Sequence, residues 1–136
     1  MKMPLLLLSL ALPLVCFSAC DSKFSQCEAL ISAMNRDEER LGPLATDAPA
    51  LEEVAAKLDL ASTEIGAVKV SAAELVKFRD DYQALLRDTA AGLREAAEGA
   101  RTGDKAKSEA ATKSMLEIGT RSGRLVEDVN QFCNAR

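Results

Sequence analysis

Residues 48–68 read APALEEVAAKLDLASTEIGAV, and the spacing of their apolar side chains decides the fold. The apolar positions follow one another at intervals of three and four residues: Leu51, Val54, Leu58, Ala61, Ile65 and Val68. Such spacing places them along one side of an α-helix, where they form a heptad seam that must be buried against other helices. Asp47 suits the N-cap of this helix, and Pro49 suits its first turn.

The same pattern continues on both sides of this segment. Three further stretches place apolar residues three and four apart: 24–41, 71–102 and 105–133. Gly42-Pro43 is a strong stop after the first of them, and Gly103 separates the last two. Ser71 and Glu74 match a capping box, in which each side chain accepts a hydrogen bond from the other residue's backbone N–H. No stretch alternates as a β-strand would, so we predict four helices.

The composition excludes several classes of protein. Of the 136 residues, 48% are hydrophobic and 28% are charged, which is typical of a folded domain rather than a disordered tail. The chain has no His, the commonest general base and metal ligand. A net charge of −4 argues against nucleic-acid binding through phosphates. We therefore expect no enzymatic activity, no metal and no cofactor.

The start of the chain has the features of an export signal. Lys2 provides a positive charge, and residues 4–19 carry none. This apolar run is shorter than the roughly 20 residues that a membrane-spanning helix needs, and Pro13 interrupts it. We predict that residues 1–19 are a signal peptide that is removed.

The end of this signal resembles the lipobox of bacterial lipoproteins. In Phe17-Ser18-Ala19-Cys20, small residues precede a Cys, although Leu is more usual where Phe17 stands. The resemblance covers only the first twenty or so residues. It implies that Cys20 is acylated and holds the protein to a membrane of the cell envelope, with the domain in the periplasm or at the cell surface. It also implies a sorting role for Asp21, although the choice between inner and outer membrane stays open. The alternative is ordinary secretion with Cys20 as a plain thiol.

Two cysteines remain in the mature chain, Cys27 and Cys133. Export places them in an oxidising compartment, where an even pair predicts a disulfide. A zinc site is excluded because two Cys without His or a CxxC pair do not form one. The alternative is a pair of buried free thiols.

Short connections between amphipathic helices favour antiparallel neighbours. We therefore predict an all-α, antiparallel up-down-up-down four-helix bundle over residues 24–136, joined to the lipid by a tether of residues 20–23. In this topology Cys27 and Cys133 meet at one pole. The third and fourth helices are the longest, and their distal hairpin, Thr89 to Ala111, is rich in Ala and Gly.

Several residues suit either a packed core or a ligand site. Four side chains on apolar faces are predicted either to fill the core or to contact a ligand: Met34, Phe78, Tyr82 and Met115.

Gly119 and Gly123 lie four residues apart in the fourth helix and indicate a close helix contact, local softness or a pocket over exposed backbone. Arg121 and Arg124 interleave with them, so this segment is not a membrane-embedded dimerisation motif.

Two functions follow from these observations. We expect a non-enzymatic, lipid-anchored envelope protein that acts as a structural or protein-interaction module, with the distal hairpin contacting an unidentified envelope protein. The alternative is a helical-bundle lipoprotein that binds a small apolar ligand or lipid between its helices.

Overall fold

The computed structural model describes residues 22–41 and 47–135. Within them the chain forms no strand and four α-helices: α1 (Lys23–Leu41), α2 (Ala48–Gly66), α3 (Ala73–Thr102) and α4 (Lys105–Asn134). The prediction of an all-α bundle with longer third and fourth helices is confirmed, since α3 and α4 have 30 residues each and α1 and α2 have 19. None of these four described helices is both long and apolar enough to cross a membrane.

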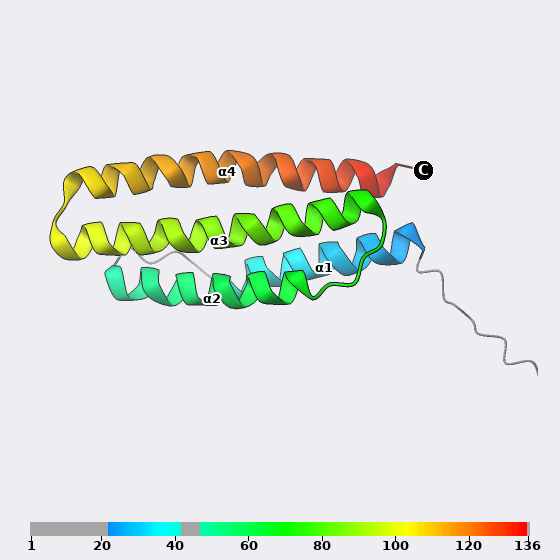
Figure 1. The fold of residues 1–136 in the computed structure, drawn as a ribbon, viewed down its shortest axis with the longest axis horizontal. Coiled ribbons are helices and arrows are strands. Elements are labelled where there is room, and N and C mark those ends of the chain that lie inside the picture. Colours follow the sequence, from blue (N-terminus) through cyan, green and yellow to red (C-terminus); the bar gives the residue numbers. More distant parts are fainter. Residues whose placement is uncertain (1–21, 42–46, 136) are drawn as a thin grey trace, which may run out of the picture.

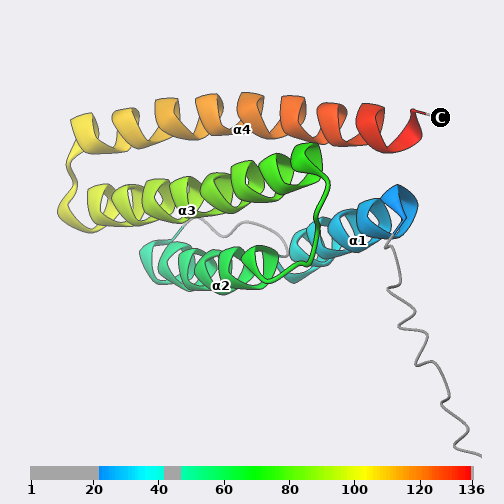
Figure 2. The same cartoon turned by 45° about the vertical axis from the view of Figure 1, so that its right-hand side comes forward.

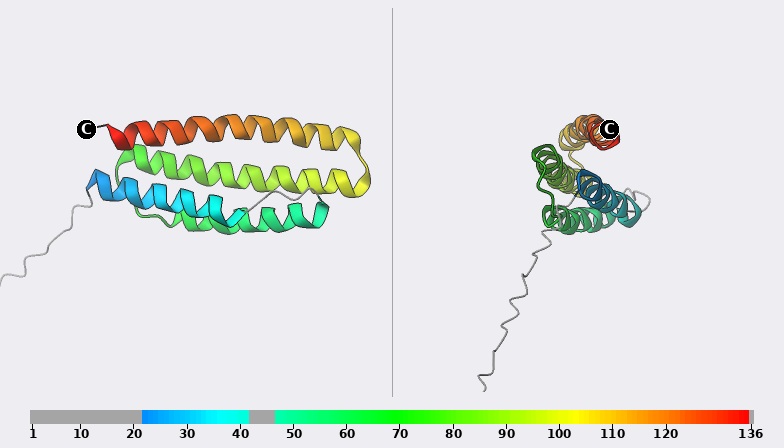
Figure 3. Two further views of the ribbon diagram at one scale, coloured as in Figure 1. Left: turned by 180° about the vertical axis from the view of Figure 1, so that it is seen from behind. Right: turned by 90° about the vertical axis from the view of Figure 1, so that its right-hand side faces the viewer.

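The helix α3 lies at the centre of the bundle. Figure 1 shows consecutive helices running in opposite directions, with α2 and α4 on opposite sides of α3. The end-on view in Figure 3 places α1 beside α2 and well away from most of α4. The bundle is therefore open on the side between α1 and α4.

The residues of the 48–68 seam face the core, all but Val68 from within α2. Four of them are buried and the other two are half-buried against the core: Val54, Leu58, Ala61 and Ile65, then Leu51 and Val68. The helix ends at Gly66, two residues before the predicted end. Asp47 caps its start as predicted, because its side chain accepts a hydrogen bond of 2.9 Å from the backbone N–H of Ala50.

The distal hairpin is packed through its small residues. The small side chains that face inward between α2, α3 and α4 are Ala90, Gly92, Ala97, Gly99 and Ala111. At Gly99 an added Cβ would lie 3.1 Å from the backbone nitrogen of Ser108, so a larger residue would separate the two helices. Gly103 links them with a φ of 68°, a conformation that glycine adopts without strain.

A disulfide joins α1 to α4 at one pole of the bundle. Cys27 and Cys133 are bonded, with their Cα atoms 5.8 Å apart, which confirms the predicted pairing. Around it, the Lys23 ammonium donates a 2.9 Å hydrogen bond to the Ala135 carbonyl and lies 4.4 Å from the centre of the Phe132 ring. These contacts hold the beginning of α1 against the end of α4.

The predicted capping box at the start of α3 is wrong. The N-cap is Ala72, and no side chain of α3 itself caps the helix. Instead, the side-chain oxygen of Gln26, which is buried in α1, accepts hydrogen bonds from the backbone N–H groups of Ser71 at 2.6 Å and Ala72 at 3.2 Å. The Ser71 hydroxyl lies 3.3 Å from the same oxygen. The side-chain oxygen of Gln26, which tertiary packing brings to this point, therefore replaces the predicted acceptor, the carboxylate of Glu74.

Replacing Gln26 by Ala should lower the free energy of unfolding by about 1–2 kcal/mol, because the start of α3 loses its acceptor. Gln131→Ala makes the same truncation at an exposed position of α4 and is the matched control, which should leave the stability nearly unchanged. Urea denaturation measures the free energy of unfolding of both variants and of the parent protein. A Gln26→Ala protein as stable as the parent would show that the amide does not cap α3.

Candidate functional site

A groove of about 410 Å³ runs between α1 and α4, with α3 as its floor. It arises from the arrangement of the helices. The disulfide holds α1 and α4 together at one pole, and Figure 2 shows α1 diverging from α4 as it leaves that pole. The volume falls within the range of small-molecule pockets, roughly 300–1,000 Å³.

The lining of the groove is largely apolar and carries no charged side chain. Its apolar side chains come from all three helices: Ile31, Met34, Tyr82, Leu85, Leu86, Met115, Ile118, Val126 and Val129. The remaining residues are uncharged: Asn35, Thr89, Gly119, Ser122 and Asn130. In a chain with 28% charged residues, such a lining favours a neutral ligand.

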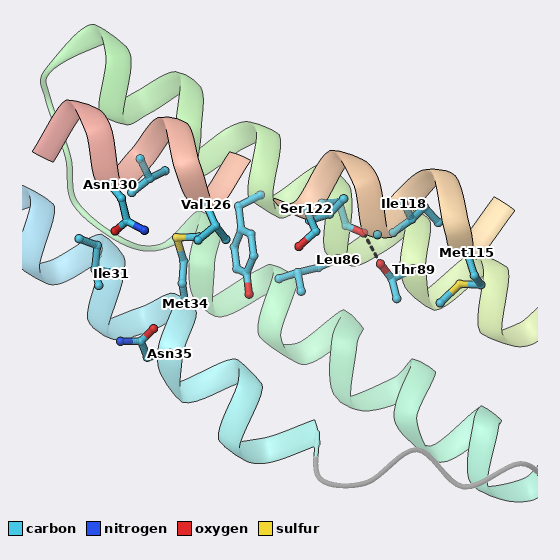
Figure 4. Close-up of a pocket in the computed structure, with 14 residues that line it drawn as sticks. Ile31, Met34, Asn35, Leu86, Thr89, Met115, Ile118, Ser122, Val126 and Asn130 are labelled. Atoms are coloured by element: carbon cyan, nitrogen blue, oxygen red, sulfur yellow. Dashed lines mark hydrogen bonds between the residues drawn. The ribbon is translucent and has the colours of Figure 1, made fainter. Parts of the chain in front are cut away.

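Three of the four predicted core or ligand residues line this groove. Figure 4 shows Met34 reaching in from α1 and Met115 from α4 at the far end of the groove, and Tyr82 lines the groove from α3. Unbranched methionine side chains adapt easily to the shape of a bound molecule. Phe78 is not part of the lining. Its ring packs edge-on against Phe132, with the ring centres 5.8 Å apart, and so belongs to the core beside the disulfide.

The glycines of α4 do not mark a helix contact within the described residues. A Cβ added at Gly119 or Gly123 would meet no atom within 4 Å. Gly119 lines the groove, which agrees with the third of the predicted roles, a pocket over exposed backbone. Besides Gly99, a glycine in close contact with α4 is Gly92 of α3, where an added Cβ would be 2.9 Å from the Met115 sulfur. Gly92 thereby makes room for Met115 at the far end of the groove.

The polar residues of the groove are difficult to predict from the sequence. Ser122 stands in register with the apolar seam of α4, which is the one signal that could have placed it inside. Asn35 and Asn130 are exposed and resemble ordinary surface residues. The Thr89 hydroxyl donates a 2.7 Å hydrogen bond to the Leu85 carbonyl (Figure 4), so it is satisfied within its own helix.

A buried carboxyl group lies outside this lining. Asp37 of α1 is only 2% exposed, and its Oδ2 atom has no hydrogen-bond partner among the described residues. Burial raises the pKa of this carboxyl above its ordinary value of 3.8, opposed by nearby Arg40 and Arg36 and assisted by Glu64. The guanidinium of Arg40 forms a 2.5 Å ion pair with Glu64.

The raised pKa of Asp37 predicts a pH-dependent cost to stability. As pH rises above about 3.8, the unfolded chain releases this proton before the folded chain does, so stability falls until the folded group has also ionised. Asp37→Asn should therefore raise the free energy of unfolding at pH 7 by about 1 kcal/mol or more. The difference from the parent should shrink at pH 3. Denaturant titrations at both pH values measure this difference in the free energy of unfolding. An equal difference at pH 3 and pH 7 would contradict a raised pKa of Asp37.

The described residues contain no group of three or more His, Cys, Asp and Glu placed to hold a metal ion. The predicted lipidation residue Cys20 and sorting residue Asp21 lie outside the described residues. No family model matches the chain, and neither curated proteins nor solved structures provide a match.

Proposed function

We propose that this chain is a non-enzymatic, lipid-anchored protein of the cell envelope that binds a small apolar ligand in the groove between α1 and α4. The observation that carries the proposal is the groove itself, an uncharged and largely apolar space of about 410 Å³. Methionines at two places along it suit a ligand of variable shape.

The groove favours ligand binding over an interaction module built on the distal hairpin. The small residues of that hairpin are buried between α2, α3 and α4. Its exposed side chains include several charged ones: Glu95, Arg101, Asp104, Lys105, Lys107 and Glu109. Such a surface is typical of a solvated helix face and is not specific for a partner.

The expected affinity is moderate. A ligand that buries about 300 Å² of apolar surface gains roughly 7 kcal/mol, before the cost of its immobilisation is subtracted. Dissociation constants should therefore be about micromolar or weaker. Such affinities suit reversible uptake and release.

The anchor is the second part of the proposal. Only Asp21 stands between Cys20 and Ser22, so an acylated Cys20 would attach the bundle to the membrane at the pole that holds the disulfide. Several acyl chains on one residue would make this attachment stable, because each buried CH₂ contributes about 0.8 kcal/mol.

Filling the groove should weaken binding of a neutral probe. N-phenyl-1-naphthylamine, whose fluorescence rises in apolar surroundings, should bind the parent protein. Gly119→Leu should weaken that binding about tenfold or more, because the new side chain projects into open space within the lining.

Gly119→Ala is the matched control. It makes the same gain in helix propensity but leaves most of the groove open, so its affinity should stay within about twofold of the parent's. Circular dichroism establishes that both variants fold. Equal probe binding by all three proteins would place the probe elsewhere and refute ligand binding in this groove.

Intact-mass analysis of the protein purified from envelopes tests the anchor. The mass should correspond to a chain that begins at Cys20 and carries acyl groups, and Cys20→Ala should appear in the soluble fraction. A mature chain with an unmodified Cys20 would exclude the lipid anchor and leave the groove proposal intact.

A further inference from the structure

The groove continues toward the disulfide pole as a shallow depression on α4. The depression is lined by Gly123, Val126, Glu127, Asn130, Gln131 and Asn134. Val126 and Asn130 belong to both linings, so the depression adjoins the groove. In Figure 4, Asn130 marks the end of the groove from which the depression leads on, and Met115 marks the opposite end.

The chemistry of the lining changes along this path. Between Met115 and Val126 it is mainly apolar, whereas the amides of Asn130, Gln131 and Asn134 follow toward the pole. The apolar stretch spans 12 residues, from Met115 to Val126, and rises about 16 Å along the helix. One leaflet of a membrane's hydrocarbon core is about 15 Å deep, so the stretch matches the length of one acyl chain in a bilayer.

The charges along the path disfavour an anionic head group. Neither lining contains a Lys or Arg, and the only charged side chain is that of Glu127. Lys23 is at the same pole, but its ammonium already donates to the Ala135 carbonyl and covers the Phe132 ring. A carboxylate or phosphate placed here would meet Glu127 without a cation from either lining to offset it.

We infer that the groove takes a single-chain membrane lipid with an uncharged, hydroxyl-bearing head, of the monoacylglycerol class. The acyl chain lies along α4 from Val126 to Met115, and the head lies among the amides of Asn130, Gln131 and Asn134. The amides can both donate hydrogen bonds to hydroxyl groups and accept them. A volume of about 410 Å³, near the low end of the range for ligand pockets, suits one chain rather than two. This inference rests on the proposed function, since it names the ligand of the same groove.

The test compares two ligands that have the same acyl chain and different head groups. Monopalmitoylglycerol and palmitate are titrated below their aggregation concentrations, at a pH where the carboxylate is ionised, against the parent protein with bound N-phenyl-1-naphthylamine. Monopalmitoylglycerol should displace the probe at a concentration about threefold or more below that of palmitate, which corresponds to the effect of an exposed like-charge contact.

A charge reversal at the head end should abolish this preference. Glu127 is exposed, so Glu127→Lys should fold normally, and it should improve displacement by palmitate about threefold or more. Glu117→Lys makes the same charge change on an exposed position of α4 outside both linings, and should leave the order of the two ligands unchanged.

The outcomes separate this inference from the proposed function. If the probe binds and Gly119→Leu weakens it, the groove is a ligand site. Palmitate acting as well as monopalmitoylglycerol, or no displacement by either lipid, would then overturn the assigned ligand class alone. A Glu127→Lys preference identical to that of Glu117→Lys would overturn the assigned position of the head. Failure of the probe to bind would remove both proposals.

Discussion

The covalent bond between Cys27 and Cys133 is the constraint on which the form of the bundle depends. The helix α1 has its most extensive contacts with α2, and near α4 it is held by the disulfide and the contacts of Lys23. A bridge that closes a loop of about 100 residues stabilises a fold by roughly 4–5 kcal/mol in chain-entropy models. That is a large share of the 5–15 kcal/mol usual for a domain. The bond fixes α1 and α4 at one end only, so their divergence creates a wedge-shaped space.

The space stays open because the helices differ in what they pack against. Small residues in the distal half of α3 let α2 and α4 approach it closely from opposite sides. The helix α1 has only 19 residues and is tilted away from α4, so the apolar face of α4 from Met115 to Val129 is covered by α3 alone over much of its length. Polar uncharged residues at the rim, such as Ser122 and Asn130, tolerate water when no ligand is present, whereas a wholly apolar wall would favour closure.

The helices and the disulfide could be predicted because their signals are local or compositional. Gly42-Pro43 and Gly103 separate segments whose apolar spacing is unambiguous, and an even pair of cysteines behind a predicted export signal leaves few alternatives. The groove could be predicted only in part. Met34, Tyr82 and Met115 were identified from their apolar faces, but an apolar face does not say whether a neighbour fills the space before it. The cap from Gln26 and the burial of Asp37 could not be foreseen, since both depend on how α1 is placed against distant segments.

The position of the groove relative to the proposed anchor gives the two proposals a common physical basis. Moving an acyl chain from a bilayer into water costs about 0.8 kcal/mol of free energy for each CH₂. The cost is roughly 12 kcal/mol for a chain of sixteen carbons. Passage through water would therefore be slow. The amide-rich end of the groove lies at the disulfide pole, where an acylated Cys20 would hold the bundle against the membrane. The acyl chain of a lipid could then pass from the bilayer to the groove with little exposure to water. An anchor at the opposite pole would place that entrance more than 40 Å away, since α4 has 30 residues and is about 45 Å long.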